Sequence, residues 1–494
     1  MRKLLVLLIL SFGLVWGQSG TLEIAVDQSP VGFDPHVVTA FSSFAVIGQI
    51  YDGLLEVNAD LQLEPALAES WEVSDDGLTY TFTLRDDVNF HNGRALSADD
   101  IVYSYNRIMD EATGSPIASR FSEVASVEAA DERTVVFNLS APFAPFLSNL
   151  TSLTVVPQEV VEENGDLQQV AVGTGPFMLE EIVPDTYVLL KANPDYYRES
   201  QPMLAELKYN VVPEASTRAA GLRTGQFHLL PDVDPATAET IRGTDSVELL
   251  EIQDLAYTLL GVNTTKAPFD NPQVREAINL AINRDEIVEA VYFGNAVPGG
   301  PLSPGLTDWA LETSEFGCYA HDADAAKALL EEAGYAGEEL EILTFGTMKV
   351  VSDLAQVLQA QLQDAGVNAT VNVEEFGNFV QRWKNSDFDM FVSLNGGNTD
   401  PDGYFYRTFY TDGSTNVYKF ANDDVNSLLD EGRVTTEFEA RKPLYDDLQR
   451  QLACQGPIAH VAYGTLFSAV RDNVQGFQQM PTRGLRYLRN ATVE

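Results

Sequence analysis

Hydrophobic and polar positions alternate regularly in one segment of the chain. Residues 80–84 read Tyr-Thr-Phe-Thr-Leu, and this period of two predicts a half-buried strand. The Asp-Asp-Gly turn at 75–77 indicates that this strand pairs with the one before it. Ser97, with Asp99 and Asp100 just after it, is typical of the N-cap and first turn of a helix. The segment therefore predicts a hairpin followed by a capped helix.

Strands and helices alternate through the rest of the chain. Residues 207–230 and 340–373 each read as strand, helix, strand, the order of a parallel crossover unit. A new set of elements begins near residue 257, and residues 467–488 show strand-like alternation. Because 494 residues exceed one ordinary core, we predict an α/β protein of at least two lobes.

The charge balance restricts the possible partners. The chain has 73 acidic and 30 basic residues, a net charge of −43, and its 45% hydrophobic content is that of a globular protein. Nucleic acids and anionic membrane surfaces are excluded as partners, because a polyanion is repelled by such a surface.

The N-terminus predicts export. Arg2 and Lys3 precede an apolar run that starts at Leu4 and ends in small residues around Gly17, as in a secretory signal peptide of residues 1–17. An uncleaved anchor is the alternative, but the run is shorter than the ~20 residues of a spanning helix. No cysteine follows the run, so we expect no lipid anchor. The mature protein is expected to be soluble and periplasmic or secreted.

Two cysteines remain in the chain, Cys318 and Cys454. In an oxidising compartment an even pair is more often bridged than free, which predicts a disulfide between them. The alternative is two buried thiols that pack as small hydrophobic groups.

The loop at residues 395–402 is the main candidate for ligand binding. It follows a predicted strand at 388–394, and ligands of open α/β sheets bind beyond the carboxyl ends of strands. It combines amides, carboxylates and glycines that allow close backbone approach, and aromatic residues follow it. The alternative is an ordinary solvated turn. The predicted contacts here are Asn395, Gly397, Asn398, Asp400, Asp402, Tyr404, Tyr406 and Arg407.

Two features of this segment leave alternatives open. Tyr404 and Tyr406 alternate, so we expect one to face the ligand and the other to pack. Arg407 offers a bidentate fork for a ligand carboxylate, but a surface acid is an equal candidate for its partner.

A second group of candidates lies elsewhere in the chain. Thr39, Phe41 and Ser42 follow the first strand, where the chain should meet the cleft, although Phe41 is more typical of a core residue. Asn263 ends a probable strand, and its alternative is a turn-forming amide.

Enzyme signatures are absent from the sequence. None of the five histidines stands in a zinc-protease arrangement, and there is no nucleophile elbow or phosphate-binding loop. We therefore expect no catalysis, no metal site and no cofactor. A secreted hydrolase is the remaining enzyme hypothesis, because 73 acidic residues could include a catalytic pair.

Several segments resemble one protein family. These are residues 51–108, VGTGPF at 172–177, NPDYY at 193–197, residues 261–288 and AKALLEEAGY at 326–335. They are similar to the dipeptide/oligopeptide/nickel-binding family (family 5) of extracytoplasmic solute-binding proteins of ABC transporters. The resemblance implies the two-lobe periplasmic-binding-protein fold (class II type), with an extra α+β domain inserted in the first lobe. The expected division is a signal peptide at 1–17, lobe I at 18–55, 173–257 and 470–494, the inserted domain at 56–172, and lobe II at 258–469.

The resemblance also implies a function. A solute, most simply a di- or oligopeptide, would be held between the lobes of a monomer and passed to a permease. Peptide-binding relatives carry an aspartate that pairs with the ligand's α-amino group. Aligned on Asp400 and Pro401, that position falls on Gly397, and a usual aromatic falls on Leu394. Asp400 or Asp402 could take the place of that aspartate, or both could be structural. An oligosaccharide or an amine-blocked peptide is therefore an alternative ligand.

Overall fold

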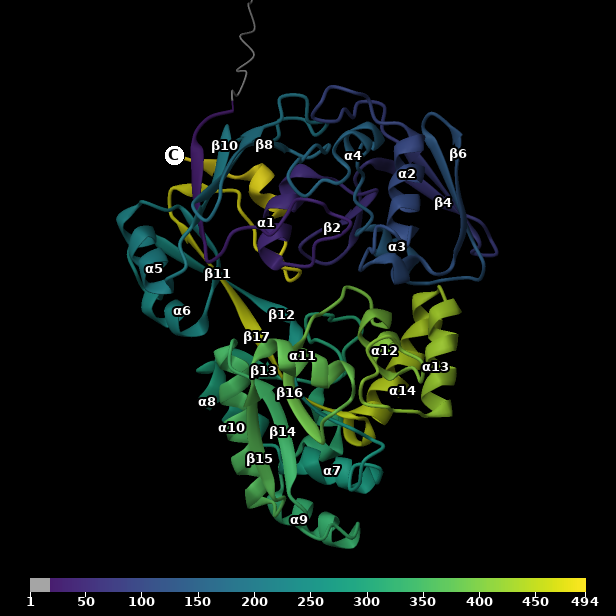
Figure 1. The fold of residues 1–494 in the computed structure, drawn as a ribbon, viewed down its shortest axis with the longest axis vertical. Helices are drawn as coiled ribbons and strands as arrows, with labels where there is room; N and C mark the ends of the chain where they lie inside the picture. Colours follow the sequence, from purple (N-terminus) through teal and green to yellow (C-terminus); the bar gives the residue numbers. More distant parts are fainter. Residues whose placement is uncertain (1–17) are drawn as a thin grey trace, which may run out of the picture.

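The computed structural model describes residues 18–494, so the predicted signal peptide lies outside the described residues. Figure 1 shows two lobes connected by two long antiparallel strands, β12 (Val247–Val262) and β17 (Ile458–Arg471). Both lobes share one sheet, in the order β15-β14-β16-β12-β17-β11-β1-β10-β9-β8. In this part of the chain no helix is both long and apolar enough to cross a bilayer.

The first lobe is built on β1 (Thr21–Val26), which lies between two strands parallel to it. Its other strands are β8 (Phe177–Val183), β9 (Tyr187–Ala192), β10 (Glu206–Val211) and β11 (Leu229–Val233). Its helices are α1 (Phe41–Ile50), α5 (Ala215–Thr224) and α6 (Pro235–Ile241).

A separate four-stranded antiparallel sheet has its own hydrophobic core, and we call it and the helices beside it the small-sheet unit. Its strand order is β4 (Ala68–Val73), β5 (Thr79–Leu84), β7 (Thr134–Leu139) and β6 (Val124–Asp131). Its helices are α2 (Ala98–Met109), η1 (Ala118–Phe121), α3 (Phe146–Leu150) and α4 (Gln158–Asn164). The hairpin of β2 (Leu55–Val57) and β3 (Leu63–Pro65) precedes it.

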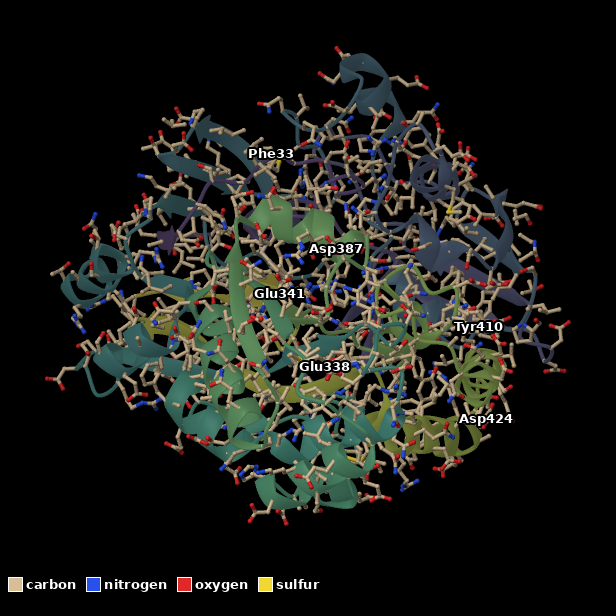
Figure 2. The ribbon with its side chains drawn as sticks, turned by 60° about the horizontal axis from the view of Figure 1, so that its bottom comes forward. Phe33, Glu338, Glu341, Asp387, Tyr410 and Asp424 are labelled. Carbon is tan, nitrogen blue, oxygen red and sulfur yellow. A yellow bond between two sulfur atoms is a disulfide. The ribbon has the colours of Figure 1, made fainter. Side chains whose placement is uncertain are left out.

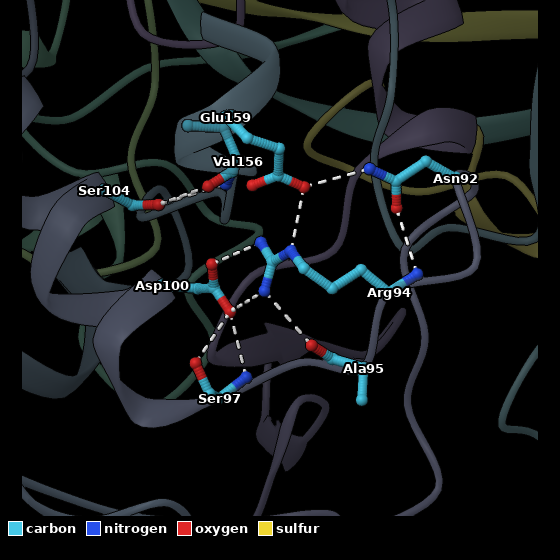
Figure 3. Close-up of polar contacts among 8 residues, drawn as sticks. All are labelled: Asn92, Arg94, Ala95, Ser97, Asp100, Ser104, Val156 and Glu159. Carbon is cyan, nitrogen blue, oxygen red and sulfur yellow. Dashed lines mark hydrogen bonds and ion pairs between the residues drawn. The ribbon is translucent and has the colours of Figure 1, made fainter. Parts of the chain in front are cut away.

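The local predictions for this unit are confirmed. Tyr80, Phe82 and Leu84 are buried on one face of β5, as the alternation requires. Ser97 is the N-cap of α2, and its backbone N–H donates to the Asp100 carboxylate at 2.9 Å. Figure 3 shows how Arg94 joins Asp100 to Glu159 of α4, and so ties the start of α2 to the neighbouring helix.

The second lobe contains the predicted crossover unit. Its strands are β13 (Ala296–Pro298), β14 (Leu340–Phe345), β15 (Ala369–Glu374) and β16 (Met390–Asn395), and β14 lies parallel to both β15 and β16. Its helices are α7 (Pro272–Ala281), α8 (Arg284–Tyr292), α9 (Ala323–Glu332), α10 (Lys349–Asp364), α11 (Phe376–Lys384), α12 (Asp402–Phe409), α13 (Asp423–Val434) and α14 (Phe438–Gln455). A disulfide joins Cys318 to Cys454 of α14, with a Cα–Cα distance of 5.7 Å.

Two predictions of where single elements start or end are wrong. No new element starts near residue 257, because β12 runs unbroken from the first lobe into the second. The strand-like alternation of residues 467–488 continues as a long strand only to Arg471. Beyond it lie β18 (Val474–Gln475), η4 (Arg486–Asn490) and β19 (Thr492–Val493). A strand that crosses two lobes changes its neighbours midway, so its hydrophobic pattern has no single period.

Candidate functional site

The parallel strands of the second lobe point their carboxyl ends at the junction between the lobes. Strand β16 runs antiparallel to β12, so that Met390 pairs with Val262 at the far end and Asn395 pairs with Tyr257 at the junction. Because β14 is parallel to both β15 and β16, all three strands end on the same side.

The parallel strands of the first lobe end at the same junction from the opposite side. Strand β11 pairs antiparallel with β17, with Leu229 opposite Val470 and Val233 opposite Phe467, closer to the junction. Strands β1 and β10 run in the same direction as β11. The loops that follow six strands therefore converge on one region, which is where open α/β sheets bind ligands.

The crossing strands are irregular at this junction. Gln253 pairs with Thr465 and Tyr257 pairs with Tyr463, so residues 254–256 of β12 stand opposite Gly464 alone. Such a bulge bends the strand and turns its backbone groups out of the sheet.

Side chains from both lobes hold this bulge. The hydroxyl of Ser303 donates to the Asp254 carbonyl at 3.0 Å, and that of Tyr404 donates to the Leu255 carbonyl at 2.7 Å. From the first lobe, Arg483 donates to the Asp254 carboxylate at 2.6 Å. The bulge is thus in contact with side chains of both lobes.

Gly397 lies directly against the bulge. A Cβ atom at this position would be 2.2 Å from Leu255 Cβ and 2.4 Å from the Leu255 carbonyl carbon, far inside van der Waals contact. A Cβ at the neighbouring Gly396 would meet nothing within 4 Å. Both glycines are exposed to solvent. Any side chain at position 397, including an aspartate, therefore requires the loop backbone to move.

The Asp400 carboxylate forms an ion pair with another residue of the protein. Arg441 of α14 donates to both of its carboxylate oxygens, at 2.7 and 2.8 Å, and both side chains are buried. Asp400 also accepts the Asp402 backbone N–H at 2.9 Å, as at the start of a helix. These bonds favour the structural role of Asp400 over the predicted ligand contact.

Asp402 is buried beside Arg433, whose Nε lies 3.3 Å from its carboxylate. Burial raises the pKa of the Asp402 carboxyl to about 7, against the opposing effect of Arg433. The Arg433 guanidinium lies over the rings of Tyr406 at 3.7 Å and of Phe143 at 4.7 Å. Since Phe143 belongs to the small-sheet unit, Arg433 connects that unit to the second lobe.

The predicted alternation of Tyr404 and Tyr406 is wrong, because residues 402–409 form the helix α12. Tyr404 is buried and stacks on Tyr257 with ring centroids 6.1 Å apart. Tyr406 is half-buried and stacks at 4.5 Å on Tyr410, which is labelled in Figure 2. The Asp400 carboxylate accepts the Asp402 backbone N–H at the start of this helix, a contact that hydrophobic periodicity does not reveal.

The remaining polar residues of the loop differ in their contacts. Asn395 donates to the Tyr257 hydroxyl at 3.0 Å, and Asn398 accepts the Asp400 backbone N–H at 3.1 Å. Arg407 of α12 is exposed, and among residues 18–494 no carboxylate pairs with it.

Thr39, Phe41 and Ser42 lie at and just before the start of α1. The core prediction for Phe41 is wrong, because its side chain is 66% exposed. It forms an edge-to-face pair with the exposed Phe44. The guanidinium of Arg483 lies 5.6 Å from the Phe41 ring, so the residue that holds the bulge also contacts this aromatic pair.

Asn263 is not brought to the candidate loop. It follows Val262, at the end of β12 that is distant from the junction. Its amide donates to the Ser386 carbonyl at 2.9 Å, and its oxygen accepts the Thr265 backbone N–H at 3.1 Å. The structure therefore favours the turn-forming alternative.

A separate hollow of about 610 Å³ lies in the first lobe and the small-sheet unit. Its walls include Asp34 and Arg107, which form a buried ion pair. No residue of the second lobe lines it, so a molecule there would not connect the two lobes.

The sequence did not point to the arginines that shape the site, Arg433, Arg441 and Arg483. Each acts on a residue far away in the chain, such as Asp400 for Arg441 and Asp254 for Arg483. The only signal was the scarcity of basic residues in an acidic chain.

Known proteins match this chain over nearly its whole length. The family described as bacterial extracellular solute-binding proteins, family 5 (middle region), matches residues 62–416. The dipeptide-binding protein of Escherichia coli is 30% identical over 97% of this chain and 95% of that protein. A Helicobacter pylori periplasmic binding protein solved with the peptide STSA is 28% identical, with a TM-score of 0.82 over 97% of this chain and 99% of that one. A Campylobacter jejuni protein solved with Ni(L-His) is 25% identical, with a TM-score of 0.82 over 96% and 99%.

Proposed function

Because this chain belongs to the family 5 bacterial extracellular solute-binding proteins, we propose that it is a receptor that holds a short peptide between its lobes. It would deliver this ligand to the permease of an ABC transporter. It would work outside the cytoplasmic membrane as a monomer, since the loops that converge on the junction come from both lobes of one chain.

One observation carries this proposal. Three parallel strands from each lobe end at a single junction, and the loop beside it exposes its backbone at Gly396 and Gly397. An extended peptide is recognised largely through main-chain hydrogen bonds, and glycines allow the ligand backbone to come close. The relatives with a dipeptide-binding name or a bound peptide support the same ligand class.

The mechanism is closure of the two lobes around the ligand. The lobes are connected by β12 and β17, and a ligand that touches both lobes stabilises the closed arrangement. No bond of the ligand is made or broken. The bulge at residues 254–256 is the natural bending point, because pairing between the crossing strands is interrupted there.

The position of Gly397 makes this proposal more specific. The crossing strand excludes a side chain at 397, so no carboxylate there can hold the ligand's α-amino group. We expect peptides with an acetylated amino end to bind about as tightly as free peptides.

Calorimetric titration of residues 18–494 tests the proposal. The panel contains trialanine, acetyl-trialanine, other di- to pentapeptides, and maltose and cellobiose oligomers. Saturable binding of peptides, but not of sugars, is the expected result. Binding of oligosaccharides alone would replace the peptide assignment by the sugar alternative, and hydrolysis of any ligand during titration would point to an enzyme instead.

A further inference from the structure

A backbone group of the small-sheet unit completes the C-terminal end of α13 in the second lobe. The last four carbonyls of a helix have no partner within that helix. In α13, the Gly432 carbonyl accepts from Arg441 of α14 at 2.8 Å. The next carbonyl, that of Arg433, accepts the Ala144 backbone N–H at 2.7 Å, although Ala144 belongs to the small-sheet unit. The end of this helix therefore depends on both sides of the junction.

The turn that carries Ala144 is held firmly in its own unit. A proline stands two residues before Ala144 and another directly after it, and each fixes one backbone angle. The Phe146 backbone N–H donates to the Phe143 carbonyl at 3.0 Å, which closes the turn. The Phe143 side chain is buried in the core of the small-sheet unit. The Ala144 N–H thus reaches the second lobe from a fixed position.

The side chain of Arg433 contacts the same turn. Its guanidinium lies 4.7 Å from the centroid of the Phe143 ring and 3.7 Å from that of the Tyr406 ring. One ring belongs to the small-sheet unit and the other to α12, so the cation lies against an aromatic ring from each side of the junction. A guanidinium is attracted to an aromatic face, and more strongly where water is excluded. Arg433 therefore binds the turn through both its backbone and its side chain.

The candidate loop extends from the crossing strands to Arg433. At one end, Gly397 lies against Leu255 of the β12 bulge. At the other end, the Asp402 carboxylate lies 3.3 Å from Arg433 Nε. Figure 1 shows α3, which directly follows the turn, facing α12 and α13 to the right of the crossing strands. The loop therefore connects the bending point of the molecule with the contact on its far side.

We propose that Arg433 is a latch between the lobes: it holds the turn at residues 143–146 while a ligand is enclosed, and it releases this turn when the lobes open. The inference rests on the proposed function, because it takes the ligand to lie between the lobes. A hydrogen bond between neutral groups and a cation over a ring each add little net stability once water can replace them. Such a latch delays the escape of the ligand without trapping it. Arg433 is a positioning residue, since it acts through the loop and the turn.

The rate at which bound trialanine dissociates tests the latch, measured by stopped-flow displacement with a competing peptide. Phe143→Leu removes the ring but keeps an apolar side chain in the core, and Arg433→Gln removes the guanidinium. We expect each change to speed dissociation about threefold to tenfold. The matched control is Phe146→Leu, because Phe146 is buried in the same core and its ring packs on Tyr80 and Phe137 of its own unit. This control should leave the rate unchanged.

The double Phe143→Leu/Arg433→Gln variant separates the latch from a local effect of Arg433 on Asp402. If the two side chains act through one contact, the double variant should dissociate no faster than Arg433→Gln alone. Accelerations that multiply would show that they act independently, and would overturn the latch. Equal acceleration by Phe146→Leu, or an unchanged rate in either single variant, would overturn it as well.

Small-angle X-ray scattering decides the question if no peptide binds the wild type, a result that would contradict the proposed function. Loss of the latch shifts the lobes toward the open arrangement. The radius of gyration of ligand-free Phe143→Leu and Arg433→Gln should therefore exceed that of the wild type, and Phe146→Leu should match the wild type. Equal radii for all four proteins would then overturn the latch too.

Discussion

Asp400 and Arg441 form a buried ion pair with two parallel hydrogen bonds, at 2.7 and 2.8 Å. The pair fastens the candidate loop to α14, which lies 41 residues further along the chain. Its geometry is that of a bidentate fork, which fixes orientation as well as distance. The loop is therefore a rigid part of the second lobe rather than a free turn.

Arg441→Gln should destabilise the protein by about 3–5 kcal/mol, because it leaves the buried Asp400 carboxylate without its counter-charge. Urea unfolding measures this loss. Arg450→Gln, at an exposed pair, is the control and should change stability by less than about 0.5 kcal/mol. A similar small change for Arg441→Gln would show that the buried pair does not hold the loop.

Two adjacent glycines should respond differently to the same substitution. Gly397→Ala places a Cβ atom 2.2 Å from Leu255 Cβ, so the loop must shift and peptide binding should weaken at least tenfold by calorimetry, about 1.4 kcal/mol. Gly396→Ala adds a methyl group that meets nothing within 4 Å, and it should fold and bind like the wild type. Equal behaviour of the two variants would contradict the close contact with the crossing strand.

The Tyr404 hydroxyl should be needed for the bulge. Tyr404→Phe removes the donor that satisfies the Leu255 carbonyl, so we expect a loss of about 1–3 kcal/mol in urea unfolding. The matched control is Tyr410→Phe, which removes only an exposed contact with Asp430. Its effect should stay within about 0.5 kcal/mol. The proposed role of Tyr404 fails if its variant is as stable as this control.

Asp402 should make stability depend on pH. Its pKa is about 7 in the folded protein and 3.8 ordinarily, so the folded state keeps a proton that the unfolded state releases between these values. Stability should therefore fall as pH rises from about 4 to 7, by on the order of 4 kcal/mol, and then level off. Asp402→Asn removes this contribution and should flatten the curve from urea unfolding at each pH. The exposed Asp424→Asn is the control, and an unchanged slope for Asp402→Asn would refute the assignment.

The disulfide should add substantially to stability. Cys318 and Cys454 are 136 residues apart, and closing a loop of that size stabilises by about 4–5 kcal/mol in the chain-entropy description. The double Cys318→Ser/Cys454→Ser variant should lose this amount in urea unfolding. Reduction of the wild type should have the same effect, whereas it should not change the double variant. A midpoint that reduction leaves unchanged would contradict the bond.

Local pattern predicted a large part of the fold. The strand at residues 80–84, the cap at Ser97 and the crossover unit of β14, α10 and β15 depend on neighbours within a few residues, so periodicity and capping chemistry suffice. The helix at residues 402–409 and the exposure of Phe41 did not follow from pattern. The helix begins next to Asp400, whose carboxylate is held by Arg441 of α14, 41 residues away. The exposure of Phe41 depends on what lies opposite α1 in space.

The α/β alternation, the multi-lobed size, the acidic character and the loop where ligand contact is expected could all be predicted from the amino-acid sequence. Each of these depends on composition or on short-range order. The bond between Asp400 and Arg441, and the lack of room beside Leu255 at Gly397, became visible only in the folded chain. Such relationships join residues that are distant in the chain, and sequence spacing alone does not fix their separation in space.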